Sequence, residues 1–263
     1  MGVIAPVYYG PEQKIRDLAA HLQISLGGDV IDTGENPAQA ARQAVVEAVR
    51  GRSRALMKGS LHTDEILSAV VARDGGLRGD SRITHTFVFD LPRYDRLLAL
   101  TDAVINISPD VRTKADAIGN ACALMRALGV ERPRVAIVAA VETVNPGIAA
   151  TLHAQALVEI AGEGRFGDAI VEGPMGFDVA VSEVAANMKG LQSRVAGRPD
   201  IIVAPDLNAG NILYKSLVYM AGAECAGVVQ GARLPIILTS RADSAFSRVA
   251  SCALASLLSA GDG

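Results

Sequence analysis

The sequence predicts an α/β protein, built from mostly parallel sheets with helices packed against them. Short apolar runs alternate with longer amphipathic stretches along the whole chain, as in folds where parallel strands are joined by helices. Half of the 263 residues are apolar, only 4% are aromatic, and Trp is absent. Small aliphatic residues must therefore fill the core, which is typical of parallel strands buried on both faces.

Each expected strand is a short apolar run bounded by polar or glycine-containing turns. The expected strands are Val3–Tyr8, Val30-Ile31, Ala55–Met57, Thr84–Phe89, Ala103–Ile107, Val135–Ala139, Ala169–Val171, Ile201–Ala204, Ala226–Val229 and Ile236–Leu238. The expected helices are Pro11–Leu22, Pro37–Arg50, Thr63–Ala72, Arg112–Leu128, Pro146–Ala161, Phe177–Met188, Asn211–Ala221 and Ser244–Leu258. Asn145-Pro146 reads as a cap residue followed by proline at the first helical position.

A domain boundary is expected in the middle of the chain. Leu128-Gly129 ends one helix, and the charged, proline-containing stretch 131–134 leads into the next strand. At this length the chain forms either one large domain or two small ones. The linker favours two.

Composition and motifs exclude several classes of function. The net charge is −3 and the basic residues are scattered, which argues against nucleic-acid binding. We expect no membrane span, and three cysteines without metal-ligand spacing indicate a reduced, cytoplasmic protein. The sequence has no Walker A motif, no dinucleotide fingerprint and no metal-binding pattern. His21, His85 and His153 belong to no recognisable constellation.

Polar residues collect in five turns that follow expected strands. Ligands of parallel sheets bind beyond the carboxyl ends of the strands, where helix N-termini suit phosphate. The five turns are 58–63 (KGSLHT), 142–147 (ETVNPG), 172–176 (EGPMG), 205–211 (PDLNAGN) and 239–244 (TSRADS). They predict a site for a phosphate-bearing substrate.

Structural explanations compete with this interpretation. Ser240 and Asp243 have the spacing of a capping box, which needs no substrate. Arg241 is also what a solvated surface arginine looks like, although it directly follows an apolar strand. The remaining candidates have ordinary local roles as well: Lys58 as a surface lysine, His62 as a loop residue, Asp206 and Asn208 as turn formers, and Asn145 and Asn211 as caps.

Several of these stretches resemble the phosphate acetyl/butyryltransferase family, over nearly the whole chain and in order. The most specific are 205–215 (PDLNAGNILYK) and 235–244 (PIILTSRADS), the latter similar to the butyryltransferase branch. Further matches are 56–65 (LMKGSLHTDE), 141–146 (VETVNP) and 172–178 (EGPMGFD). The sequence looks most like the phosphate acyltransferase part of enoyl-CoA hydratase/phosphate acetyltransferase fusion proteins.

The resemblance implies two α/β domains similar to isocitrate and isopropylmalate dehydrogenases, a cleft between them, and a homodimer. The first domain would be discontinuous, residues 1–131 with 232–263, and the second would span 132–231. The implied reaction is acyl-CoA + phosphate ⇌ acyl phosphate + CoA, with a short acetyl, propionyl or butyryl group. CoA is a substrate here, and no cofactor or metal is implied.

The resemblance also implies roles for individual residues. Ser240 and Arg241 match the family's transition-state residues, and Asp243 is the nearest carboxylate that could act as the thiol base. The implied substrate-binding residues are Lys58, Ser60, His62, Asn145, Asp206, Asn211, Lys215 and Arg233.

Two departures favour the butyryl-like branch. Acetyltransferases carry an acidic residue a few positions beyond the Ser-Arg pair, and in this sequence that position is occupied by Ser247. Their arginine after the His-Thr pair is missing, because the region reads Ser68-Ala69, with Arg73 a turn later. Two other functions stay open: an acyl-CoA-sensing module without catalysis, and a dehydrogenase of the same fold.

Overall fold

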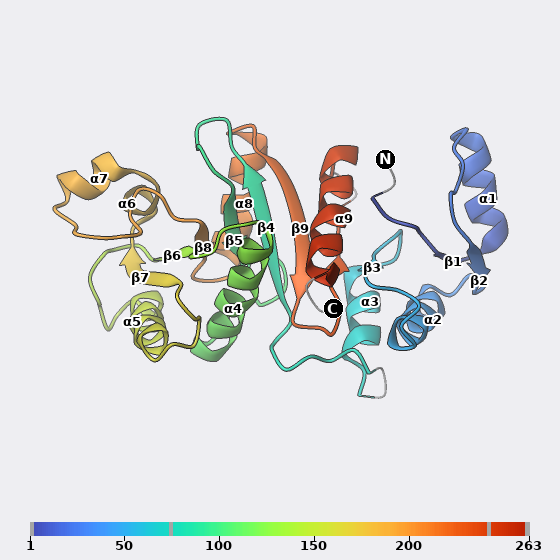
Figure 1. Cartoon of the computed structure of the whole chain (residues 1–263), viewed down its shortest axis with the longest axis horizontal. Coiled ribbons are helices and arrows are strands. Elements are labelled where there is room, and N and C mark those ends of the chain that lie inside the picture. The colour runs from blue at the N-terminus through green and yellow to red at the C-terminus, as the bar shows by residue number, and fades with distance from the viewer. Residues whose placement is uncertain (1–2, 74–75, 241–242, 261–263) are drawn as a thin grey trace. The chain divides into compact units, whose positions relative to one another are not determined.

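The computed structural model describes residues 3–73, 76–240 and 243–260 (Figure 1). The chain divides into two compact units. The first comprises the chain up to Asp80 together with the segment from Gly231 onward, and the second is Ser81–Gln230.

The first unit contains two pairs of parallel strands. β1 (Tyr8–Gly10) pairs with β2 (Val30–Asp32), and β3 (Leu56–Met57) pairs with β10 (Ile236–Ile237). The helices of this unit are α1 (Glu12–His21), α2 (Pro37–Val49), α3 (Thr63–Val71) and α9 (Ala245–Ala260). Because β3 and β10 run in the same direction, the turns into α3 and α9 leave the same edge.

The second unit contains six hydrogen-bonded strands with helices on both faces. Its strands are β4 (Thr84–Asp90), β5 (Leu98–Thr101), β6 (Arg134–Val138), β7 (Ile170–Met175), β8 (Ile201–Val203) and β9 (Glu224–Gln230), in the order β9-β4-β5-β8-β6-β7. β4 is antiparallel to both of its neighbours, and the other adjacent pairs are parallel. The helices are α4 (Val111–Ala127), α5 (Ala149–Gly162), α6 (Phe177–Val181), α7 (Glu183–Met188) and α8 (Leu207–Tyr219).

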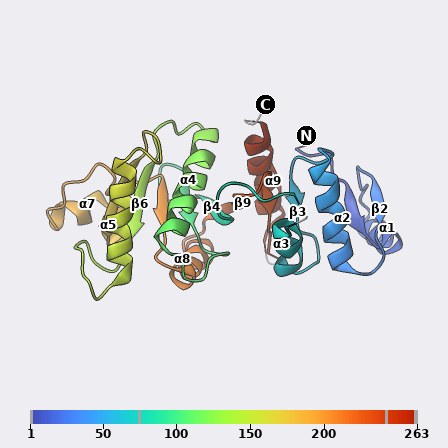
Figure 2. The same ribbon diagram turned by 90° about the horizontal axis from the view of Figure 1, so that it is seen from below.

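Strand β8 shows how the sheet divides the core of this unit. Ile201 and Val203 pack into the cluster beneath α4 and α5, which lie side by side (Figure 2). Ile202 and Ala204 point the other way, into the cluster beneath α8. Alternate residues of one buried strand thus serve two apolar faces, which explains why its sequence is a continuous apolar run. The α/β class with mostly parallel strands is confirmed.

Some expected element boundaries are wrong. The expected strand Ala103–Ile107 is a turn, because the Asp102 carboxylate accepts the N–H groups of Val104 at 2.9 Å and Ile105 at 3.0 Å. The strand lies just before it, as β5. Similarly, β1 begins only at Tyr8 rather than spanning Val3–Tyr8.

Two expected helices also differ from the structure where a side chain forms a local turn. α5 begins at Ala149, because Asn145 folds back onto the N–H of Gly147 at 2.8 Å instead of capping the helix. The expected helix Phe177–Met188 is two helices, since Ser182 breaks it and caps α7 through the N–H of Ala185.

The compact units divide the chain differently from the sequence-based domains. The expected boundary near residue 131 lies inside the second unit, where α4 packs against β4, β5 and β8. The return to the first unit at Gly231 lies one residue from the expected position.

Candidate functional site

The first unit gathers candidate residues where β3 and β10 end. The N–H of Lys58 donates to the carbonyl of Ile237 at 2.9 Å, so the two turns begin side by side. The half-buried Lys58 ammonium group lies 3.3 Å from both the Gly59 and Leu61 carbonyl oxygens. Ser60 is exposed in the same turn. The turn therefore holds the positive charge of the Lys58 side chain close to its own backbone.

The same turn leads into α3 at His62. The Glu65 carboxylate accepts the backbone N–H of His62 at 2.7 Å, which is one arm of a capping box. His62 is exposed at the helix start. The structure thus supports a local role for the backbone of His62 and brings the residue near Ser60 and Lys58 in the same turn.

The turn after β10 is closed by Asp243. Its carboxylate accepts the N–H of Ser240 at 2.6 Å, and its own N–H donates to the Ser240 carbonyl at 3.2 Å. The cap of α9 is instead Ser244, whose hydroxyl accepts the N–H of Ser247 at 3.0 Å. The capping-box prediction is therefore corrected: Asp243 supplies one arm, but Ser240 does not cap the helix.

Ser240 itself is exposed and lies beside a cation that the sequence did not suggest. Arg248, one turn into α9, places Nη2 at 3.3 Å from the Ser240 carbonyl oxygen. Arg241 lies outside the described residues. Ser247, which occupies the position of the acidic residue in acetyltransferases, is buried.

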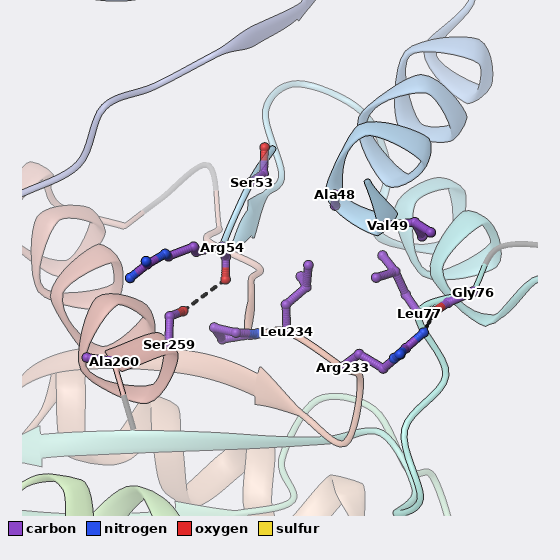
Figure 3. A pocket seen from close by; sticks show the side chains of 11 residues that line it. Ala48, Val49, Ser53, Arg54, Gly76, Leu77, Arg233, Leu234, Ser259 and Ala260 are labelled. Atoms are coloured by element: carbon purple, nitrogen blue, oxygen red, sulfur yellow. Dashed lines mark hydrogen bonds between the residues drawn. The ribbon is translucent and has the colours of Figure 1, made fainter. Parts of the chain in front are cut away.

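Arg233 lies at the opposite end of β10 from Ser240. It precedes the strand, its N–H donates to the Leu77 carbonyl at 2.9 Å, and its Nη1 donates to the Gly76 carbonyl at 3.0 Å. Figure 3 shows it beside a cavity of about 410 Å³ that Arg54 also lines. The structure does not bring Arg233 together with the turns that hold Lys58 and Ser240.

In the second unit, the turn after β8 is held mainly by contacts within the unit. The Asp206 carboxylate accepts the N–H of Ala209 at 3.0 Å and so caps α8, which corrects the expectation that Asn211 is the cap. Asn211 instead donates its side-chain amide to the Ala103 carbonyl at 3.2 Å. A Cβ at Gly210 would lie 3.0 Å from the Asp102 carbonyl oxygen, so glycine lets α8 approach this loop.

Lys114 is a buried lysine that sequence reasoning missed. It is 3% exposed on α4, and its Nζ lies 3.1 Å from Nδ1 of His153 on α5. Burial lowers the pKa of Lys114 to about 8, opposed by the negative charge of Asp206. Burial and the Lys114 charge lower the pKa of His153. At neutral pH the lysine is therefore charged and the histidine is a neutral acceptor.

A second charged group lies beyond β6 and β7. The Lys189 ammonium contacts the Glu142 carboxylate at 2.8 Å and the Asp178 carboxylate at 3.0 Å. These contacts lower the pKa values of Glu142 and Asp178 and raise that of Lys189. Gly176 leaves room for the two carboxylates, since a Cβ there would lie 2.6 Å from Glu142 Oε1.

The other two candidates of this unit are Asn145 and Lys215. Asn145 is exposed and engaged in its own turn. Lys215 is exposed on α8, nine residues after Asp206, which is about 13 Å along the helix. Helix geometry therefore does not bring Lys215 to the strand ends.

Within the described residues, no group of three or more His, Cys, Asp or Glu side chains is arranged to hold a metal ion. Over the same residues, no helix is long and apolar enough to cross a membrane. Cys122, Cys225 and Cys252 are buried.

Comparison with known proteins identifies the family. The model of the family Phosphate acetyl/butaryl transferase matches residues 16–256. A phosphate acetyltransferase from Rhizobium meliloti is 48% identical over 261 residues, covering 99% of this chain and 82% of that protein. A probable phosphate butyryltransferase from Bacillus subtilis (strain 168) is 42% identical over 247 residues, covering 94% of this chain and 82% of that protein. The solved structure of a branched-chain phosphotransacylase from Enterococcus faecalis V583 superposes with a TM-score of 0.81 at 27% identity. The superposition covers 96% of this chain and 98% of that one. This chain belongs to the phosphate acetyl/butyryltransferase family.

Proposed function

We propose that the protein transfers a short acyl group between CoA and inorganic phosphate. A phosphate oxygen attacks the thioester carbonyl, the new C–O bond forms, the C–S bond breaks, and CoA leaves as its thiolate. The observation that carries this proposal is the 48% identity to a phosphate acetyltransferase over 99% of the chain. Identity of 42% to a probable phosphate butyryltransferase supports a substrate range from acetyl to butyryl.

The chemistry demands cations and hydrogen-bond donors rather than a redox cofactor. A free thiol has a pKa of about 8.5, so the enzyme must stabilise thiolate and the oxyanion that forms on the carbonyl. We assign these tasks to Ser240 and Arg241, with Lys58 binding phosphate. We propose that CoA enters only as a substrate and that no metal takes part.

Asp243 is proposed as the base that takes the thiol proton in the reverse reaction. One of its carboxylate oxygens accepts the Ser240 N–H at 2.6 Å, so the base role falls to the other oxygen. Among the remaining proposed substrate contacts, Ser60 and His62 share the turn with Lys58. Asp206, Asn211 and Asn145 have structural hydrogen bonds that would explain them without substrate.

The reaction is tested with acetyl-, propionyl- and butyryl-CoA, each with and without phosphate. We expect phosphate-dependent release of CoA, and a loss of about 100-fold in kcat for Arg241→Ala, because one transition-state donor is removed. Binding of acyl-CoA without turnover of any of the three would favour a sensing module and contradict the proposal. An Arg241→Ala variant as fast as wild type would contradict the role of Arg241.

We further propose a cytoplasmic homodimer. Tyr219 and Met220, at the end of α8, are 70% and 86% exposed, and an exposed pair of large apolar residues supports a protein contact. Light scattering on the purified protein tests this: a dimer mass is expected, and its loss in Tyr219→Ser/Met220→Ser would locate the contact.

A further inference from the structure

The first unit contains a cavity of about 410 Å³ beside the residues that lead into β3 and β10 (Figure 3). Its volume is within the range of small-molecule sites. All of its lining residues belong to this unit: they come from the ends of α2 and α9, the loop before β3, the segment after α3 and the segment before β10. The cavity is therefore complete within one unit.

Two of the lining residues are arginines without an acidic partner. Arg54 and Arg233 are both exposed, and neither forms an ion pair with a residue that the structure describes. Arg50 and Arg52, which precede them in the chain, differ in this respect, because both contact the Glu47 carboxylate, at 2.6 and 2.7 Å. A single solvated arginine is ordinary on a protein surface, but two such arginines line this one cavity.

Both guanidinium groups keep most of their hydrogen-bond donors. Arg233 donates through Nη1 to the Gly76 carbonyl at 3.0 Å, which uses one of its five N–H groups. The Arg54 side chain forms no hydrogen bond within the described part of the chain, and only its backbone carbonyl is engaged, accepting the Ser259 hydroxyl at 2.9 Å. The planar fork of a guanidinium matches the two oxygens of a carboxylate.

Apolar side chains lie between the two arginines. Figure 3 shows Arg54 on one side of the cavity and Arg233 on the other, with Leu77 and Leu234 between them. Among the described lining residues, the only other polar side chains are those of two serines. This arrangement suits a ligand with an acidic group at each end and a hydrocarbon spacer, because a polar spacer would lose hydrogen bonds to water.

The helix ends at the cavity favour carboxylates over phosphates. Ala48 and Val49 end α2, and Ser259 and Ala260 lie at the end of α9. Both helices thus contribute their C-termini, which carry partial negative charge. Phosphate is favoured at helix N-termini, and none lines this cavity within the described residues. One carboxylate paired with each arginine needs no helix N-terminus.

We propose that this cavity binds a small dicarboxylate, with one carboxylate at Arg54, the other at Arg233, and a hydrocarbon spacer across the leucines between them. The site is separate from the groups assigned to the reaction. Arg54 and Arg233 precede β3 and β10, whereas Lys58 and Ser240 follow these strands. The proposal goes beyond acyl transfer and gives Arg233 a ligand other than the substrates.

Calorimetry with succinate, adipate and suberate tests recognition of the two acidic ends. We expect one of the two longer diacids to bind more tightly than succinate. Monomethyl adipate should bind at least about tenfold more weakly than adipate, because one charge-assisted contact is lost. Inorganic phosphate should bind more weakly than the best diacid. Equal affinities along the series, an ester that binds as well as its diacid, or tighter binding of phosphate would overturn the proposal.

Arg54→Gln is the most direct variant, because the Arg54 side chain has no contact in the described residues on which folding depends. We expect it to weaken binding of the best diacid at least about tenfold, and Arg233→Gln to do the same. Arg42 on α2 is also exposed, forms no ion pair with a described residue and lies outside the cavity. Arg42→Gln removes the same charge and should change the affinity less than about twofold. Unchanged affinity in Arg54→Gln, or equal losses in Arg54→Gln and Arg42→Gln, would refute the site.

Competition with a substrate separates this site from the reacting groups. The affinity for the best diacid should be the same with and without saturating acetyl-CoA. A diacid displaced by acetyl-CoA would place the cavity within the substrate site and contradict the proposal. The measurement requires no turnover, so its outcome is independent of the proposed function.

Discussion

The turns after β8 and β10 follow one pattern in sequence but use their polar residues differently. After β8, Asp206 caps α8, Asn211 binds a neighbouring loop, and Gly210 permits the close approach of the helix. After β10, Ser244 caps α9, and Ser240 remains exposed. The more distinctive motif is thus largely explained by folding, whereas capping does not explain Ser240. A specific motif does not by itself identify the residues that perform chemistry.

The largest expected effect concerns the pH dependence of the stability of the second unit. His85 is fully buried on β4, and burial lowers its pKa to about 4, opposed by Asp102. Between pH 6.5 and 4 the unfolded chain binds this proton and the folded chain does not, so stability falls as pH falls. The loss approaches about 3 kcal/mol at pH 4.

Urea unfolding at pH 4.5 and pH 7 measures this effect. His85→Leu should reduce the difference in unfolding free energy between the two pH values. His21→Leu, at an exposed position of α1, should leave that difference unchanged. An unchanged pH dependence in His85→Leu would refute the buried neutral histidine.

A smaller effect is expected at Lys114. Burying its charged ammonium group lowers the free energy of unfolding of the second unit, and this loss is the cost of the buried charge. Its pKa of about 8 lies below the ordinary 10.5, so the cost is fully present below pH 8 and disappears as pH rises through 10.5. Lys114→Met should therefore raise the unfolding free energy at pH 7 by about 2 kcal/mol, after allowing for the lost hydrogen bond to His153.

The same substitution should lower kcat/KM about tenfold, because a positive charge near Asp206 no longer attracts the anionic substrates. Lys14→Met, at an exposed site on α1, is the control for both measurements. A destabilised Lys114→Met protein with full activity would show that the lysine only supports the fold.

The smallest effect tests the packing of α8. Gly210→Ala and Gly119→Ala both gain about 1 kcal/mol of helix propensity, but only the first Cβ meets neighbouring atoms, at 3.0 Å. We expect Gly119→Ala to raise the melting temperature and Gly210→Ala to lower it, with a net loss of about 1 kcal/mol. If Gly210→Ala were also stabilising, the close approach of α8 would not constrain this position.

Much of the fold was predictable where local signals agree. Asn36 caps α2 with Pro37 at its first position, and the apolar run Ile201-Ile202-Val203 forms β8. The strand β5 was missed because Asp102 turns the more obvious apolar run after it into a loop. Side-chain hydrogen bonds to the backbone override hydrophobicity there.

The site was less predictable because its contacts are long-range. Lys114 looks like any helical lysine until α5 brings His153 beside it. The position of Arg233 could have been inferred, since a residue before a strand lies at the end opposite to the turn that follows it. Which polar residues cap their own helix also depends on shifts of a few residues, as Ser240 and Ser244 show.

The central claim is that the turn after β10 carries the chemistry and the turn after β8 mainly supports the fold. The most direct test compares kcat of Ser240→Ala and Asp206→Asn with acyl-CoA and phosphate both saturating. The kcat of Ser240→Ala should fall about 100-fold, and its melting temperature should be unchanged. The kcat of Asp206→Asn should stay within about fivefold of the wild-type value, since asparagine caps helices as well as aspartate does. A large loss in Asp206→Asn together with a nearly fully active Ser240→Ala would contradict the account.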